Sequence, residues 1–285
     1  KNWKNHGPKL SPKDFSWATG DAYAAEVAER DGKFYFYVST FHKDDDRSNG
    51  GAAIGVAVAD SPLGPFKDAK GEALIYNEMT TDNPHGWDDI DPSVFVDDDG
   101  QAYMYWGNGS LKMVKLKDNM IELDGEIQYY NPKNFIEGPW VYKRKGLYYL
   151  VYASKGEERE RVEYATSDSP EGPWEYRGIL ADSAPNSFTI HPGIIEYKGK
   201  DYFFYHNGVL PTGGNYRRSI TVDYMYYNED GTIQKVEQTK EGVNVVLVID
   251  ISGSMQATDY EPNRLEAAKS SAEILLDSLK DKDHV

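Results

Sequence analysis

The chain has 285 residues, of which 39% are hydrophobic and 13% aromatic, so it can build one large or two ordinary domains. Its formal net charge of −16 argues against binding nucleic acid or an anionic membrane surface, because no basic stripe is available to neutralise phosphates. It has no cysteine, which excludes disulfides and cysteine-based metal sites, and no 18-residue apolar run, so we expect no membrane span.

The first ten residues, "KNWKNHGPKL", begin without a start methionine or a signal peptide. We therefore expect the chain to be a piece of something longer. No hairpin pattern precedes these residues, so they are predicted to form the outermost strand of a sheet whose other strands are missing.

Four segments then share one pattern: a short apolar stretch, a turn with glycine, and an aromatic-rich stretch. The aromatic stretches lie at 31–39, 99–107, 145–154 and 198–208. This order of residues predicts a β-hairpin in each case. Hairpins that recur along the chain indicate an all-β propeller, and the alternative is a β-sandwich. The expected blade segments are 15–76, 87–128, 134–180 and 187–238.

The pattern changes near residue 240. The run "VNVVLVID" at 243–250 is β-branched and unbroken, as in a buried parallel strand. The segment 263–282 follows, with apolar side chains on one helical face. These are Leu265, Ala268, Ala272, Leu275, Leu276 and Leu279. A βα unit is foreign to a propeller, so we predict two domains, at 1–240 and 241–285.

The stretch at 134–154 places Glu137 among apolar residues, where burying its charge is costly. The first strand of each propeller blade lines the central channel. Asp91, Glu137 and His191 all stand directly before such a strand, so they are expected to meet at one end of the channel. Acid–base chemistry on a neutral substrate needs one protonated carboxyl and one ionised carboxyl. Glu137 is the better proton donor because apolar neighbours raise a carboxyl pKa. The alternative is a surface glutamate.

Here the sequence resembles a known family. The stretches "IDPSVFVDDDGQAYMYWGN", "IEGPWVYKRKGLYYLVYAS", "HPGIIEYKGKDYFFYHN" and "RRSITVDYMYYNEDGTIQKV" are similar to consecutive blades of glycoside hydrolase family 43. The resemblance covers about 1–238. Members are five-bladed propellers that cleave arabinofuranosyl and xylosyl linkages with inversion. The resemblance implies that Glu137 is the general acid and that Asp91 orients the acid and tunes its pKa. It implies no cofactor for catalysis.

The resemblance also implies residues around the sugar. Trp17, Trp106, Asn108 and Arg218 would line the sugar pocket, and the alternative for each is blade packing or an ordinary surface position. His191 would sit near the axis, where some members hold a calcium ion or a water cluster. The alternative is a hydrogen-bonded structural histidine. The implied substrate is a plant cell-wall polysaccharide or oligosaccharide. The implied location is extracellular or periplasmic, with the cytoplasm left open.

One departure from the family concerns its general base, which is an aspartate in the first blade. The sequence begins on what resembles the last strand of that blade. We therefore expect a five-bladed propeller with its first blade mostly missing, and hydrolysis impaired by loss of the base. A carbohydrate-binding propeller without catalysis is the first alternative.

The stretch "VVLVIDISGSMQATDYEPNRLEAAK" resembles the opening of a von Willebrand factor A domain, and "DISGS" at 250–254 matches its metal-ion-dependent adhesion motif. Asp250, Ser252 and Ser254 offer hard oxygen ligands suited to Mg²⁺, in an incomplete ligand set. A protein partner bound through this domain follows from the resemblance. A metal-dependent adhesion module is therefore the second alternative for the function.

Overall fold

The computed structural model describes residues 4–43, 51–80, 85–238, 257–259 and 261–278, with the side chains of 272–278 excepted. The chain forms two compact units, Lys1–Glu237 and Gln238–Val285.

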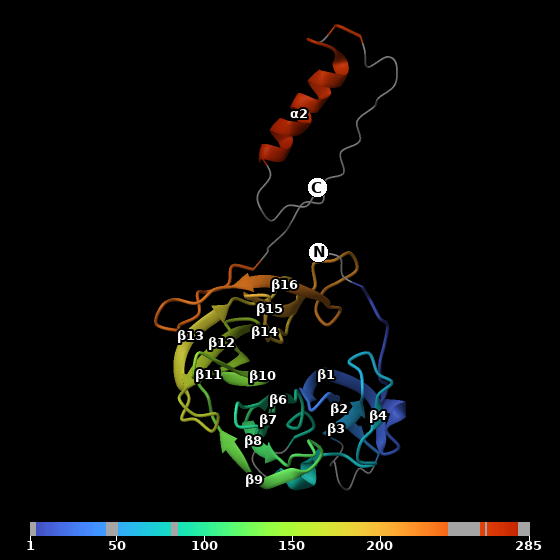
Figure 1. Cartoon of the computed structure of the whole chain (residues 1–285), viewed down its shortest axis with the longest axis vertical. Coiled ribbons are helices and arrows are strands. Elements are labelled where there is room, and N and C mark those ends of the chain that lie inside the picture. Colours follow the sequence, from blue (N-terminus) through green and yellow to red (C-terminus); the bar gives the residue numbers. More distant parts are fainter. Residues whose placement is uncertain (1–3, 44–50, 81–84, 239–256, 260, 279–285) are drawn as a thin grey trace. The chain divides into compact units, whose positions relative to one another are not determined.

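In its described residues, the first unit contains four antiparallel sheets, which form the four blades of a β-propeller (Figure 1). Blade 1 comprises β1 (Ala18–Arg30), β2 (Lys33–His42), β3 (Ala52–Ala59) and β4 (Lys67–Asp68), with β5 (Ile75–Tyr76) paired to β3. Blade 2 comprises β6 (Ser93–Val96), β7 (Ala102–Trp106), β8 (Leu111–Leu116) and β9 (Leu123–Tyr130). Blade 3 comprises β10 (Phe135–Arg144), β11 (Leu147–Lys155), β12 (Glu160–Ser167) and β13 (Glu175–Ala181). Blade 4 comprises β14 (Gly193–Tyr197), β15 (Lys200–Asn207) and β16 (Ser219–Met225). Two short 3₁₀ helices, η1 (Pro12–Asp14) and η2 (Asn77–Met79), lie outside the sheets.

The four predicted hairpins are confirmed as β1–β2, β6–β7, β10–β11 and β14–β15. Three of them close with two residues, a polar residue and then glycine. In β10–β11 these are Lys145 and Gly146, with φ of 51° and 83°. Positive φ at both positions matches the twist of the flanking strands, and glycine accepts it without a steric cost. The turn residues therefore fix where each first strand ends.

Three clusters of buried apolar side chains lie between successive blades. One is built from β1–β3 and blade 2 and includes Tyr37, Met104 and Trp106. A second is built from blades 2 and 3 and a third from blades 3 and 4. The first strands also contact one another in order, β1 with β6, β6 with β10, and β10 with β14. These first strands lie toward the middle of the propeller (Figure 1).

Two predictions about the start of the fold are corrected by the structure. The described part of the chain forms four blades, not a five-bladed ring with one blade mostly missing. Residues 4–11 form no strand, although an outermost strand was expected there. Their sequence explains this, because Pro8 lacks a backbone donor and Gly7 adopts a positive φ of 72°.

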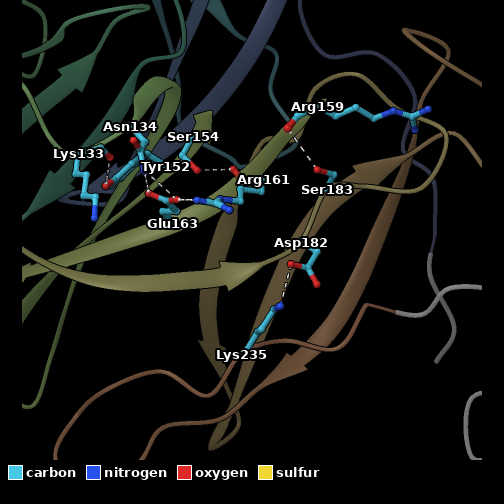
Figure 2. Close-up of polar contacts among 10 residues, drawn as sticks. All are labelled: Lys133, Asn134, Tyr152, Ser154, Arg159, Arg161, Glu163, Asp182, Ser183 and Lys235. Carbon is cyan, nitrogen blue, oxygen red and sulfur yellow. Dashed lines mark hydrogen bonds and ion pairs between the residues drawn. The ribbon is translucent and has the colours of Figure 1, made fainter. Parts of the chain in front are cut away.

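After β16 the chain returns to blade 3. The Val236 N–H donates to the Leu180 oxygen at 2.7 Å, and Val236 pairs in parallel with Ala181. Beside this bridge, Lys235 Nζ lies 2.8 Å from Asp182 (Figure 2). The outer edge of blade 3 is thereby covered by the segment that ends the first unit.

The second unit contains α2 (Arg264–Ser278), which lies within the predicted helical segment. The predicted strand at 243–250 and the predicted magnesium ligands Asp250, Ser252 and Ser254 fall outside the described residues. Among the residues that are described, no helix combines the length and the apolar character needed to cross a membrane.

Glu26 of β1 joins blade 1 to blade 2, since its Oε2 accepts the Val94 N–H at 2.9 Å. Burial raises the pKa of Glu26 to about 8. Glu26 therefore stays protonated in the folded state up to about pH 8, whereas the unfolded chain releases this proton near pH 4.5. The stability that follows from this difference is fully present below pH 4.5 and is lost as pH rises to about 8. Glu26→Gln keeps the acceptor oxygen and avoids the charge. We expect it to be more stable than the parent at pH 8.5, by on the order of 2 kcal/mol, and nearly equal at pH 4.5.

Thermal melts of both proteins at pH 4.5, 6.5 and 8.5 test this prediction. The exposed Glu29, on the same strand, provides the control variant Glu29→Gln. A stability difference for Glu26→Gln that is the same at all three pH values would contradict the burial of a titrating carboxyl between the blades.

Candidate active site

Asp91 is held at the start of β6 by contacts with two other blades. Its N–H donates to Ser39 Oγ at 2.8 Å, and its Oδ2 accepts the Gly138 N–H at 3.0 Å. Its φ is 62°, an unfavourable value for a residue other than glycine and one that is often found at functional sites. The side chain is 5% exposed. Burial raises the pKa of Asp91 to about 7, although the Gly138 hydrogen bond and the Arg218 charge oppose the shift.

Glu137 lies near the start of β10, at an irregularity in the pairing with β11. The Asn108 Nδ2 donates to Glu137 Oε2 at 2.7 Å. The pKa of Glu137 is raised to about 7, first by burial and then by the Asp91 charge, against the opposing effects of His191, Asn108 and Arg218. Asp91 and Glu137, which were predicted to share one end of the channel, therefore interact electrostatically.

His191 completes this group, because its Nδ1 lies 3.8 Å from Asp91 Oδ2. A Cβ placed on Gly138 would come within 3.2 Å of the same nitrogen, and Gly138 has a φ of 60°. Only glycine fits this approach between β10 and the loop before β14. Burial lowers the pKa of His191, and the Glu137 charge opposes that shift. The structure therefore brings Asp91, Glu137 and His191 together.

Arg218 stands directly before β16 and is exposed. Its Nη1 donates to Thr189 Oγ1 at 2.8 Å, which ties it to the loop that carries His191. The backbone oxygen of Thr189 accepts a hydrogen bond from His206 Nε2 at 2.8 Å. The Arg218 charge lowers the pKa of Asp91 and of Glu137. Arg218 thus provides a positively charged hydrogen-bond donor at the edge of the site formed by Asp91, Glu137 and His191.

A third carboxyl, Glu160, reaches this site from the start of β12, and sequence reasoning missed it. Its Oε2 accepts the Ile190 N–H at 3.1 Å, one residue before His191. The pKa of Glu160 is raised to about 8, chiefly by burial and then by the charges of Glu137 and Asp91. No signal in the sequence points to this role, because Glu160 belongs to the charged run "EERER", which is typical of a solvated turn.

The other predicted sugar-lining residues divide into two groups. Asn108 contacts Glu137, as described above, and its backbone oxygen lies 3.1 Å from His85 Nε2. Trp106 is fully buried, and its Nε1 donates to Asp89 Oδ1 at 2.8 Å. Trp17 is 7% exposed and stacks on His42 in a cluster on the other side of blade 1. These two placements fit the alternative role, blade packing.

The calcium ion or water cluster expected near His191 stays a prediction. Calcium takes six to eight oxygen ligands, and the described part of the chain holds no group of three or more histidine, aspartate or glutamate side chains arranged to bind a metal. His191 offers nitrogen, and the nearby Asp91 oxygen is engaged by Gly138.

Comparison with known proteins identifies what this arrangement resembles. Residues 1–233 match the model of Glycosyl hydrolases family 43, and residues 245–285 match that of the von Willebrand factor type A domain. The beta-D-galactofuranosidase xynD of Aspergillus niger is 31% identical in an alignment 260 residues long, which covers 85% of this chain and 73% of that protein. A xylosidase/arabinosidase of Bacteroides ovatus is 29% identical, covering 84% of this chain and 80% of that protein.

Solved structures agree with this comparison. A calcium-free beta-xylosidase/alpha-arabinofuranosidase from a compost metagenome, in complex with xylotriose, is 31% identical with a TM-score of 0.71, covering 82% of this chain and 78% of that one. An enzyme of Xanthomonas citri is 30% identical with a TM-score of 0.71, covering 82% of this chain and 77% of that one. With its propeller blades and clustered carboxyls, this chain belongs to glycosyl hydrolase family 43.

Proposed function

We propose that the chain hydrolyses O-glycosidic bonds in arabinose- or xylose-containing plant polysaccharides, with inversion at the anomeric carbon. The observation that carries this proposal is the pairing of Glu137 with Asp91, whose pKa values are both raised to about 7. Glu137 keeps a proton near neutral pH, as a general acid must. The substrate class rests on relatives named as xylosidases, arabinosidases and arabinoxylan arabinofuranohydrolases.

In the proposed reaction, Glu137 gives its proton to the glycosidic oxygen as the bond to the anomeric carbon breaks. Its Oε2 accepts from Asn108, so the proton resides on Oε1. Asp91 fixes the acid by holding the Gly138 N–H and raises its pKa by charge. Water attacks the anomeric carbon from the opposite face and loses a proton to a base. Asn108 and Arg218 hold sugar hydroxyl groups.

We further propose that the 285-residue chain alone turns over slowly. A general base has to be ionised at the working pH, and the three carboxyls gathered here, Asp91, Glu137 and Glu160, all have raised pKa values. A positioned base contributes about 10²–10⁴-fold to the rate, so activity is expected to be lower by that order than in a fully equipped enzyme.

Release of nitrophenol from a nitrophenyl β-xyloside and a nitrophenyl arabinofuranoside tests both the proposed hydrolysis and the proposed slow turnover. We expect slow but saturable hydrolysis of at least one of them by the purified 285-residue chain. Saturable sugar binding without release of nitrophenol would instead support a carbohydrate-binding propeller. Hydrolysis at ordinary enzyme rates, with kcat of about 10 s⁻¹, would show that a residue we have not assigned supplies the base.

A further inference from the structure

We propose that Phe188 and Tyr216 form an aromatic platform that binds a second sugar ring of the substrate beside the candidate active site. This inference rests on the proposed function, because it names where the rest of an oligosaccharide lies when one bond is at Glu137. Neither residue was singled out in the sequence.

The two rings lie at the same end of blade 4 as the candidate active site. β14 and β16 both pair antiparallel with β15, so β14 and β16 run in the same direction and begin at the same end. Phe188 belongs to the loop that enters β14 through His191, and Tyr216 to the loop that enters β16 through Arg218.

The loops that carry the rings are bound to each other. The Asn215 N–H donates to the Asn186 oxygen at 2.8 Å, and Ser187 Oγ donates to the Asn215 oxygen at 3.2 Å. The Gly208 N–H also donates to the Pro185 oxygen at 2.9 Å. Because these bonds flank both aromatic residues, the backbone that carries the rings is held in place before a ligand arrives, which lowers the entropy cost of binding.

Both rings face solvent. Phe188 is 44% exposed and Tyr216 is 68% exposed. Their centroids are 5.7 Å apart and their planes are tilted by 53°. The guanidinium of Arg159 lies 5.8 Å from the centre of the Phe188 ring. Figure 2 shows Arg159 ahead of β12, with its side chain extending away from the polar group around Glu163.

The platform is continuous with the residues at the carboxyls. Thr189 follows Phe188 directly and accepts a hydrogen bond from Arg218, and the Phe188 oxygen accepts the Glu160 N–H at 3.2 Å. A chain of sugars with one linkage at Glu137 therefore has its next ring within reach of these aromatics.

A pyranose ring is the occupant that matches this chemistry. One face of a sugar ring presents C–H groups, which pack on the negative face of an aromatic ring, while its hydroxyl groups hydrogen-bond to a cation such as Arg159. The sugar carries no charge, so the net charge of −16 does not repel it, as it would repel an anionic ligand.

Calorimetric titration with xylose and with xylotriose tests the platform, in the full chain carrying Glu137→Gln so that xylotriose stays intact. Phe188→Ala and Tyr216→Ala are each expected to weaken xylotriose binding by about threefold to tenfold, the scale of one aromatic contact, and xylose binding by less than about twofold. Tyr216→Phe should bind xylotriose like the parent. Tyr216 is mostly exposed, so its loss does not threaten folding.

The matched control is Tyr197→Ala. Tyr197 is 57% exposed and has a lysine near its ring, but it ends β14, about 20 Å from His191 at the usual rise of a strand. It should change neither titration. Unchanged xylotriose binding in both Phe188→Ala and Tyr216→Ala, or equal losses for both sugars, would overturn the platform. Failure of the parent to bind either sugar would overturn the proposed function as well.

Discussion

Glu137→Gln is expected to lower hydrolysis of xylobiose by about 10²–10⁴-fold, because it removes the proton that the leaving oxygen needs. Glutamine still accepts from Asn108 Nδ2, so the site keeps its shape while it loses the acid. An aryl xyloside whose leaving group departs without protonation should lose far less, about tenfold at most. Initial rates on xylobiose and on a dinitrophenyl xyloside measure both effects.

The control for this variant is Glu196→Gln on β14, where the side chain is exposed and lies away from the carboxyls. It should leave both rates unchanged. If Glu137→Gln lost the same factor on both substrates, the residue would contribute to binding or folding, and the general acid would have to be another group.

Asp91→Asn is expected to shift the alkaline limb of the activity profile to lower pH. A general acid works in its protonated form, so activity is lost as pH rises through its pKa. The Asp91 charge helps to raise the pKa of Glu137 to about 7, and asparagine removes that charge. Because the two carboxyls titrate as a pair, one proton is shared between them near neutral pH. The rate at pH 7.5 should therefore fall by about tenfold or more.

The measurement is kcat/KM for an aryl xyloside between pH 5 and 9. Asparagine keeps an oxygen for the Gly138 N–H, so the main change is electrostatic. Asp168→Asn, at an exposed position, serves as the control and should keep the parent profile. A uniform loss at every pH, with the alkaline limb in place, would show that Asp91 only positions the backbone at Gly138.

The hairpins were predictable because their signal is local. Each depends on a turn such as Lys145-Gly146 and on the alternation beside it, and neither needs another part of the chain. The meeting of Asp91 and Glu137 was also predictable, because repeats of one unit place equivalent residues around one axis. The number of blades was not, since the sequence pattern alone does not say how many sheets pack around that axis.

The places of Trp106 and Glu160 could not be predicted from the sequence, because their surroundings come from distant segments. Trp106 resembles a sugar-binding tryptophan in sequence, but its indole donates to Asp89 inside the core between the first two blades. Glu160 resembles a solvated charge, but a backbone N–H thirty residues later binds its side chain. Contacts between blades decide both cases, and a single sequence does not reveal them.

The stereochemistry of the product tests the central claim most directly. Hydrolysis of an aryl β-xyloside is followed by proton NMR, at a protein concentration high enough that cleavage outpaces mutarotation. Water that attacks from the face opposite the departing group inverts the anomeric carbon. We predict that α-xylose appears first and that β-xylose grows in only by mutarotation. Appearance of β-xylose as the first product would contradict the assignment of Glu137 and Asp91 to an inverting site.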